Sequence, residues 1–196
     1  MKKTLVFTVL ATLLLVGCGD EKDPYLVKND AVGPVTKTTQ MKQLDSIFAQ
    51  DSIVKLNPVR NAIDTQGEVE VYDKEGNKLL LLSPYDESDP SSRIANIQIF
   101  DSRYKTEKGI TKSSTFKEVK ANYEIEAIEN AINSVVVFLK GTNLYITIDK
   151  KELPEEVRYN FNSKIEASQI PDNATFKYFM IGWDAGDPIE IQDGDI

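Results

Sequence analysis

Hydrophobic and polar residues alternate along much of the chain after residue 50, and this pattern predicts antiparallel strands. Val135, Val137 and Leu139 give the clearest period-2 alternation of a half-buried strand. Glycine-containing turns at 73–77 and 140–143 separate neighbouring strands. The pattern predicts strands over 53–56, 68–72, 78–82, 94–100, 124–128, 134–139, 144–149 and 176–183.

Two short segments, 41–48 and 116–123, instead place their apolar residues at the spacing of an amphipathic helix. Before the second, Thr115 and Glu118 have the spacing of a capping box, which satisfies free amide groups at a helix start. We therefore expect one helix before each group of four strands.

The chain also contains an internal repeat. Residues 35–48 align with residues 110–123 at an offset of 75, and Gly33 and Gly109 precede the two copies. A helix followed by an antiparallel meander, used twice, predicts an α+β fold. We expect two related repeats, 35–109 and 110–183, which form a curved antiparallel sheet with helices on one face.

This layout resembles the tandem repeats of β-lactamase-inhibitor-protein-like folds, a group that includes small outer-membrane assembly lipoproteins. The glycine, the Thr-Lys pair and the helix of each copy carry the resemblance, although the Gly-x-Pro that commonly closes the helix is missing. Residues 104–116 and 170–183 resemble a family of uncharacterised Bacteroidota lipoproteins, a likeness that implies no known activity.

The N-terminus has the order of a lipoprotein signal. Lys2 and Lys3 precede an apolar stretch, 5–16, that is short for a membrane span. The following Leu15-Val16-Gly17-Cys18 resembles the lipobox of bacterial lipoproteins. The resemblance implies cleavage of the signal peptide 1–17, acylation of Cys18 and attachment to a membrane. Residues 18–34 are polar and lack periodicity, so we expect a flexible tether there.

Two further patterns concern the envelope. The acidic residues after Cys18 resemble the surface-export signal of Bacteroidota lipoproteins, which leaves a surface-exposed and a periplasm-facing orientation both open at the outer membrane. Ser46 and Ser52 each follow an aspartate and precede an isoleucine. This triplet resembles the O-glycosylation acceptor of the same bacteria. The helix expected around Ser46 argues against glycosylation at that position.

Composition narrows the possible chemistry. The 196 residues include 41% hydrophobic residues but no histidine and one cysteine, so a folded core is expected and catalytic triads, Cys-His dyads and His-ligated zinc are excluded. Loss of Lys2 and Lys3 leaves 21 basic against 31 acidic residues, a balance of −10. Such a surface repels nucleic acid, and no motif indicates a cofactor.

The polar run 106–115 is the strongest candidate for a binding loop, and with the cations just before it the segment spans 103–115. Arg103, Lys105 and Lys112 supply positive charge, Ser113 and Ser114 supply hydroxyl groups, and a loop of this kind binds an anion through free amide groups and positive charge. The alternative is a helix cap on a solvated loop, because the run lacks the glycine spacing of a phosphate loop.

Tyr85, Tyr159 and Phe161 are candidate aromatic anchors for a protein or glycan partner, or they simply cover the sheet. The acidic residues of the C-terminal tail, 184–196, offer oxygen ligands for Ca²⁺, but their spacing does not fit an EF-hand and also suits a solvated tail.

Two functions remain after these exclusions. The first is a non-enzymatic lipoprotein of the cell envelope that binds a protein or a glycan. The alternative is a small hydrolase that uses carboxylates or a metal on the same anchor. An open concave sheet face lined with aromatic residues favours binding, whereas a pocket with two carboxylates of raised pKa favours the enzyme.

Overall fold

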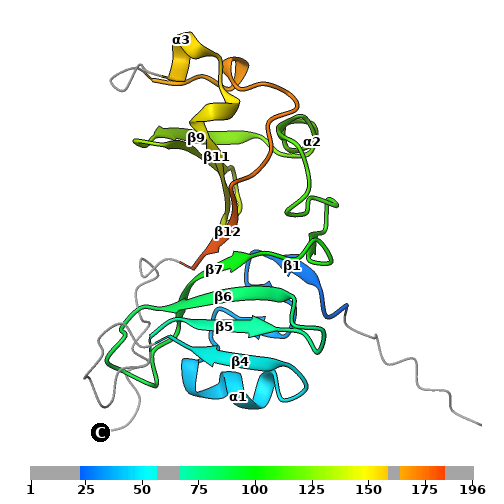
Figure 1. Cartoon of the computed structure of the whole chain (residues 1–196), viewed down its shortest axis with the longest axis vertical. Coiled ribbons are helices and arrows are strands. Elements are labelled where there is room, and N and C mark those ends of the chain that lie inside the picture. The colour runs from blue at the N-terminus through cyan, green and yellow to red at the C-terminus, as the bar shows by residue number, and fades with distance from the viewer. Residues whose placement is uncertain (1–22, 57–66, 159–163, 184–196) are drawn as a thin grey trace, which may run out of the picture.

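The computed structural model describes residues 23–56, 67–158 and 164–183, with strands as the main elements (Figure 1). Several predicted features lie outside these residues: the signal peptide 1–17, Cys18, Tyr159, Phe161 and the tail 184–196.

An eight-stranded antiparallel sheet forms the centre of the molecule. The strands from one edge to the other are β4 (Ser52–Lys55), β5 (Val69–Tyr72), β6 (Lys78–Pro84), β7 (Ile94–Ile99), β12 (Tyr178–Gly182), β11 (Leu144–Asp149), β10 (Ser134–Leu139) and β9 (Ile125–Asn130). All eight predicted strands are confirmed, and their ends agree with the prediction to within two residues. Two meanders, β4 to β7 and β9 to β12, thus meet where their last strands pair.

Strand register explains why one face of this sheet is buried. A single row of direct cross-strand neighbours places one apolar residue on the core face from every strand, because side chains in a strand alternate between faces. In sheet order from β9, the row is Ile128, Val137, Ile146, Phe179, Ile99, Leu80, Val71 and Ile53. Its six inner members are completely buried.

The predicted helices are present but short. The first consists of a 3-10 helix, η1 (Met41–Gln43), and a single turn, α1 (Leu44–Ile47), which ends because Phe48 leaves helical backbone geometry (φ −103°, ψ 33°). The second, α2 (Phe116–Asn122), begins at the predicted capping box, where the Thr115 amide donates to Glu118 Oε2 at 2.6 Å.

The expected tether over 18–34 is wrong for its second part. A four-stranded sheet contains β1 (Leu26–Lys28) and β2 (Ala31–Val32), followed by β3 (Val35–Thr36), with β8 (Lys105–Thr106) parallel to β1. Val27 and Val32 are buried, and the short strands are too brief for a visible alternation in the sequence. Gly33 makes the turn possible with a φ of +56°.

Helices and the small sheet together complete one hydrophobic core against the eight-stranded sheet. Figure 1 shows β1 and α2 on the same side of that sheet. Their buried contributions to the core include Val27, Val32, Met41, Leu44, Phe116 and Val119. The connection from β11 to β12 carries η2 (Lys150–Glu152), α3 (Glu155–Arg158) and η3 (Ala167–Gln169).

None of the helices in the described ranges is long and apolar enough to cross a membrane. The apolar stretch 5–16 lies outside those ranges.

Candidate functional site

The second face of the eight-stranded sheet carries its own continuous row of side chains. One residue from each strand is a direct cross-strand neighbour of the next: Ala127, Phe138, Tyr145, Met180, Gln98, Leu81, Glu70 and Val54. Every member is half-buried or exposed. No described helix or strand covers this row, so we name the face that carries it the open face.

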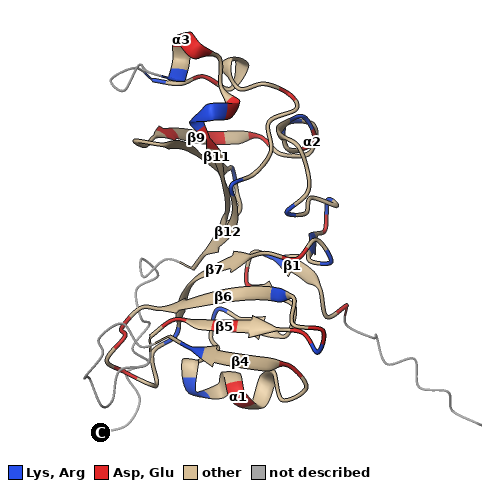
Figure 2. Ribbon diagram, viewed as in Figure 1, with Lys and Arg blue, Asp and Glu red and all other residues tan. Residues whose placement is uncertain are grey.

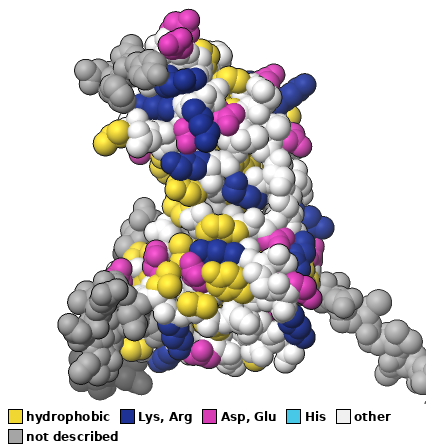
Figure 3. Space-filling view, viewed as in Figure 1, with side chains coloured by type: hydrophobic (Ala, Val, Ile, Leu, Met, Phe, Trp, Pro, Cys, Tyr) yellow, Lys and Arg dark blue, Asp and Glu magenta, His cyan; other side chains and the backbone are white. Residues whose placement is uncertain are grey.

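Figure 3 shows that the molecule is hollowed at the level of β7 and β12 in Figure 1, and that hydrophobic side chains gather there and over the neighbouring strands. Val54 and Tyr178, both on the open face, are 45% and 39% exposed. An apolar surface that is continuous across several strands indicates an interaction site more strongly than scattered exposed residues do.

Two aromatic rings form the centre of the open face in the second meander. Phe138 and Tyr145 stack with their ring centroids 5.6 Å apart and an interplanar angle of 29°. The Tyr145 hydroxyl donates to Asn96 Oδ1 at 3.1 Å, which links β11 to β7 across β12. Burial raises the pKa of Tyr145, so the phenol stays protonated as a donor at neutral pH.

Gly182 makes this arrangement possible. A Cβ atom at Gly182 would lie 3.1 Å from Asn96 Oδ1 and 3.2 Å from Tyr145 Cε1, closer than side chains normally approach. The glycine therefore leaves room for the Tyr145 ring to lie over β12 and reach Asn96.

A groove of about 500 Å³ follows these rings toward the edge strand β9. Its lining includes the aromatic residues Tyr85, Phe138, Tyr145 and Trp183 and the carboxylates Glu126 and Glu129. Tyr85, one of the predicted anchors, lines the groove and is 37% exposed. The Trp183 indole donates to the Asn29 carbonyl at 2.7 Å, which holds it against the turn between β1 and β2.

The charge of the groove comes from β9. Strand β9 carries acidic residues and no basic ones (Figure 2). Glu126 and Glu129 are exposed and have no ion-pair partner among the described residues, while the nearby Lys140 already donates to Glu124 at 2.7 Å. The described lining contains no lysine or arginine.

The predicted anion loop at 103–115 has a different role. Arg103 donates to Asp101 at 2.8 Å and to Asp73 at 2.5 Å, and its guanidinium lies 5.1 Å from the centre of the Tyr25 ring. These carboxylates raise the pKa of Arg103. Lys105 lies 3.4 Å from Asp23. Both cations are thus occupied by carboxylates of the chain.

The remaining residues of that run also have internal partners. The Lys112 ammonium donates to the Phe176 carbonyl at 2.5 Å, and burial lowers its pKa. Ser113 and Ser102 share a hydroxyl hydrogen bond of 2.5 Å, and Ser114 Oγ accepts from the Thr111 amide at 3.2 Å. The helix-cap interpretation therefore describes this loop better than an anion site.

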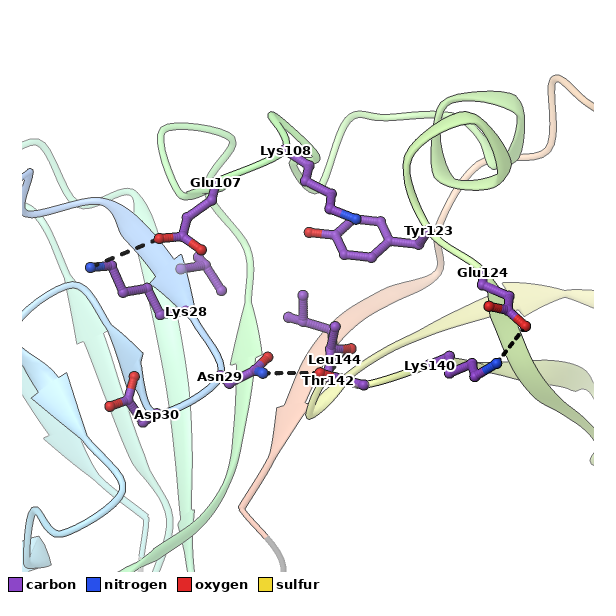
Figure 4. Close-up of a pocket in the computed structure, with 12 residues that line it drawn as sticks. Lys28, Asn29, Asp30, Glu107, Lys108, Tyr123, Glu124, Lys140, Thr142 and Leu144 are labelled. Carbon is purple, nitrogen blue, oxygen red and sulfur yellow. Dashed lines mark hydrogen bonds and ion pairs between the residues drawn. The ribbon is translucent and has the colours of Figure 1, made fainter.

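A second pocket, of about 640 Å³, lies between the turn after β1 and the hairpin between β10 and β11 (Figure 4). Its charges face one another: Lys28 lies 3.9 Å from Glu107, and Lys140 bonds Glu124. Lys108 lies 4.4 Å from the centre of the Tyr123 ring. Asn29 Nδ2 donates to the Gly141 carbonyl at 3.1 Å, which joins the N-terminal hairpin to the second meander. The charged pairs leave little free charge for a ligand.

A carboxyl group that donates a proton at neutral pH needs a raised pKa. Wherever the surroundings of a described carboxylate clearly shift its pKa, they lower it, as at Asp23, Glu70, Asp73, Asp86, Asp101, Glu118, Asp149 and Asp172. Within the described residues, no group of three or more acidic or cysteine side chains is arranged to hold a metal ion.

Ser46 and Ser52 are both exposed, Ser46 on the single turn α1 and Ser52 at the start of β4. Both hydroxyl groups therefore lie at the surface, and their glycosylation stays a prediction.

Sequence reasoning missed most of the open face. The available signal was the run Ser134–Leu139, in which Val136 and Phe138 occupy positions that a one-sided strand would give to polar residues. Only strand pairing shows that Tyr145 and Met180 extend this row.

Comparisons with known proteins concern the fold alone. No model of a known protein family matches the chain, and no curated protein matches it in sequence. Among solved structures, it is similar to the uncharacterised protein YfeY from Escherichia coli, with a TM-score of 0.53 and 14% identity. The match covers 80% of this chain and 98% of that one, and it supports the mixed α+β architecture.

Proposed function

We propose that this chain is a lipoprotein of the cell envelope, anchored to the outer membrane through Cys18, that binds a protein or glycan partner without catalysing a reaction. The open face is the binding surface. The single observation that carries this proposal is the row of side chains that runs across all eight strands, with Phe138, Tyr145 and Met180 on three adjacent strands of the second meander.

Preorganisation of the open face favours binding. The open-face side chains stand on a hydrogen-bonded sheet, and Tyr145 is fixed further by its bond to Asn96. Rigid aromatic residues lose little conformational freedom on binding, so they are frequent at the centres of interfaces.

We also propose that the two meanders are copies of one duplicated unit. The offset of 75 between residues 35–48 and 110–123 supports this, as does the pairing of the last strand of each meander at the centre of the sheet. Duplication accounts for a sheet of eight strands with covering elements on one face.

The hydrolase alternative has less support. A general acid at neutral pH needs a raised pKa, whereas Asp101, Glu70 and the other shifted carboxylates of the described residues have lowered ones. The open groove has carboxylates at Glu126 and Glu129 but is lined mainly by residues suited to contact.

Photo-crosslinking in the native envelope tests the binding surface. A photoreactive phenylalanine analogue replaces Tyr85 or Tyr178, which are exposed at the groove and on the open face. The control position is Lys117, an exposed residue on α2. We expect a discrete crosslinked product from the first two positions and none from the control. Equal crosslinking from all three positions contradicts the proposal.

The anchor has a separate test. Cys18→Ala removes the thiol that carries the lipid, so incorporation of a labelled fatty acid should stop and the protein should leave the membrane fraction. Persistent labelling of the variant shows that the lipobox interpretation is wrong.

A further inference from the structure

We propose that the groove on the open face binds a lysine- or arginine-containing apolar segment of a partner protein. This inference rests on the proposed binding function and specifies its ligand. Three features of the groove support a cationic ligand: its charge, a β-bulge that places one of its carboxylates, and the rings that form its floor.

The two carboxylates of the groove are available to a ligand. Glu126 and Glu129 are exposed on β9, which is an edge strand, and neither has an ion-pair partner among the described residues. Two cations lie nearby. The pKa of Lys140 is raised by its bond to Glu124 and also by the charge of Glu126, and Arg93 lies 5.9 Å from the centre of the Tyr85 ring. Neither cation forms an ion pair with Glu126 or Glu129 among the described residues, so a cationic ligand meets two carboxylates that are open to direct pairing.

A β-bulge directs one of these carboxylates to the open face. Phe138 pairs with Ala127, but the next residue, Leu139, pairs with Ile125, so Glu126 is the extra residue of β9. Without the bulge, strict alternation would turn the Glu126 side chain toward the core face. Bulges often re-aim a side chain beside a binding site, and here the result is a second carboxylate on the groove.

Aromatic rings form the floor beside these carboxylates. The stacked Phe138 and Tyr145 rings receive the apolar part of a lysine or arginine side chain, and ring faces attract the cationic group itself. The same chemistry already occurs within this chain, where Lys108 lies over Tyr123 and Lys78 over Phe100.

Other ligand classes fit this groove less well. An anion would meet Glu126 and Glu129 without a compensating lysine or arginine in the described lining. A neutral glycan would stack on the rings and donate hydroxyl hydrogen bonds to the two carboxylates, but it carries no positive charge to complement them. The charge pattern thus favours a cationic peptide over both.

The test measures binding of a fluorescein-labelled peptide of alternating lysine and leucine to the purified full chain by fluorescence anisotropy. A glutamate–leucine peptide is the matched probe. We expect the lysine peptide alone to bind, and its affinity to fall strongly at about 1 M ionic strength, where the screening length is about 3 Å.

The decisive variant is Glu126→Gln combined with Glu129→Gln. Both side chains are exposed, so the fold should survive, and we expect affinity for the lysine peptide to fall at least about fivefold. The control combines Glu155→Gln with Glu156→Gln on α3, which changes the net charge equally at exposed positions outside the groove. The control should bind like the unmodified chain.

Three outcomes overturn the inference: equal binding of the two peptides, unchanged affinity in the Glu126/Glu129 variant, or an equal loss in the control. Soluble oligosaccharides, maltohexaose and chitohexaose, form a further arm. If a saccharide binds and the lysine peptide does not, the ligand is a glycan, and the inference fails while the proposed binding function stands.

Discussion

Asp73 illustrates how single side chains hold separate segments of this protein together. Its carboxylate accepts from the amides of Glu75 and Asn77 in the turn between β5 and β6, and from Arg103 in the connection before β8. Arg103 in turn lies over Tyr25 at the start of the small sheet. The charged cluster that resembled an anion site in the sequence is therefore a set of internal ion pairs and hydrogen bonds that connect separate segments of the chain.

This cluster makes stability depend on pH. Burial opposes ionisation of Asp73, but hydrogen bonds from Arg103 and Asn77 outweigh it and lower its pKa to about 2. An unfolded aspartate has a pKa of about 3.9, so the stabilisation is complete above that pH and is lost as the pH falls through about 2.

We expect Asp73→Asn to lower the thermal unfolding midpoint at pH 7 and to make the loss of stability between pH 4 and pH 2 shallower, each relative to the unmodified chain. Circular dichroism melts across that range provide the measurement. Glu75→Gln, an exposed change in the same turn, should change the free energy of unfolding by less than about 0.5 kcal/mol at pH 7. An unaltered acid slope in Asp73→Asn would remove this assignment.

At the scale of elements, the N-terminal hairpin is the least expected feature. Strands of two or three residues are too short for periodicity to be recognised, yet β1 and β2 bury Val27 and Val32. The hairpin depends on Gly33, because a Cβ atom there would lie 2.3 Å from the Pro24 carbonyl oxygen.

We expect Gly33→Ala to destabilise the protein by about 2 kcal/mol or more, because a forced backbone shift adds to the strain of positive φ. Gly76→Ala is the matched control: its φ is +83°, but no atom lies within 4 Å of the new Cβ, so only the cost of positive φ, about 1 kcal/mol, applies. Urea unfolding of both variants measures the difference. Equal destabilisation would mean that the hairpin does not pack closely at Gly33.

At the scale of the whole molecule, the two meanders share one sheet and one core. Phe179 on β12 pairs directly with Ile99 on β7, and both side chains are fully buried where the meanders join. The described part of the chain should therefore unfold cooperatively as a single unit.

We expect Phe179→Ala to cost about 3–5 kcal/mol, as removal of a buried aromatic side chain does, while a single unfolding transition is retained. Met180→Ala, the next residue on β12, faces the open side and is half-buried, so its cost should be near 1 kcal/mol. Calorimetry compares the calorimetric and van't Hoff enthalpies of each variant. Two separate transitions would contradict a shared core.

Local signals in the sequence were sufficient for the eight strands of the large sheet and for the two helices that precede the meanders. Alternation over residues 134–139 and 144–149 predicted β10 and β11 with the correct ends, and the Thr115 and Glu118 pair predicted the start of α2. Each of these features depends on neighbours within a few residues, which is the range over which side-chain period and capping act. The order of the strands, in contrast, depends on which edges pair.

The sequence by itself thus determined the α+β class, the eight strands of the large sheet, the starts of the two helices before the meanders, and the absence of histidine chemistry. Only the tertiary structure decided the candidate site. Met180 is distant along the chain from Phe138 and Tyr145, and the three side chains meet because strand register places them side by side. Register also gave Glu126 its position at a bulge. The tertiary structure likewise showed that Arg103 and Lys105 of the 103–115 loop pair with carboxylates distant in sequence, and so do not form an open anion site.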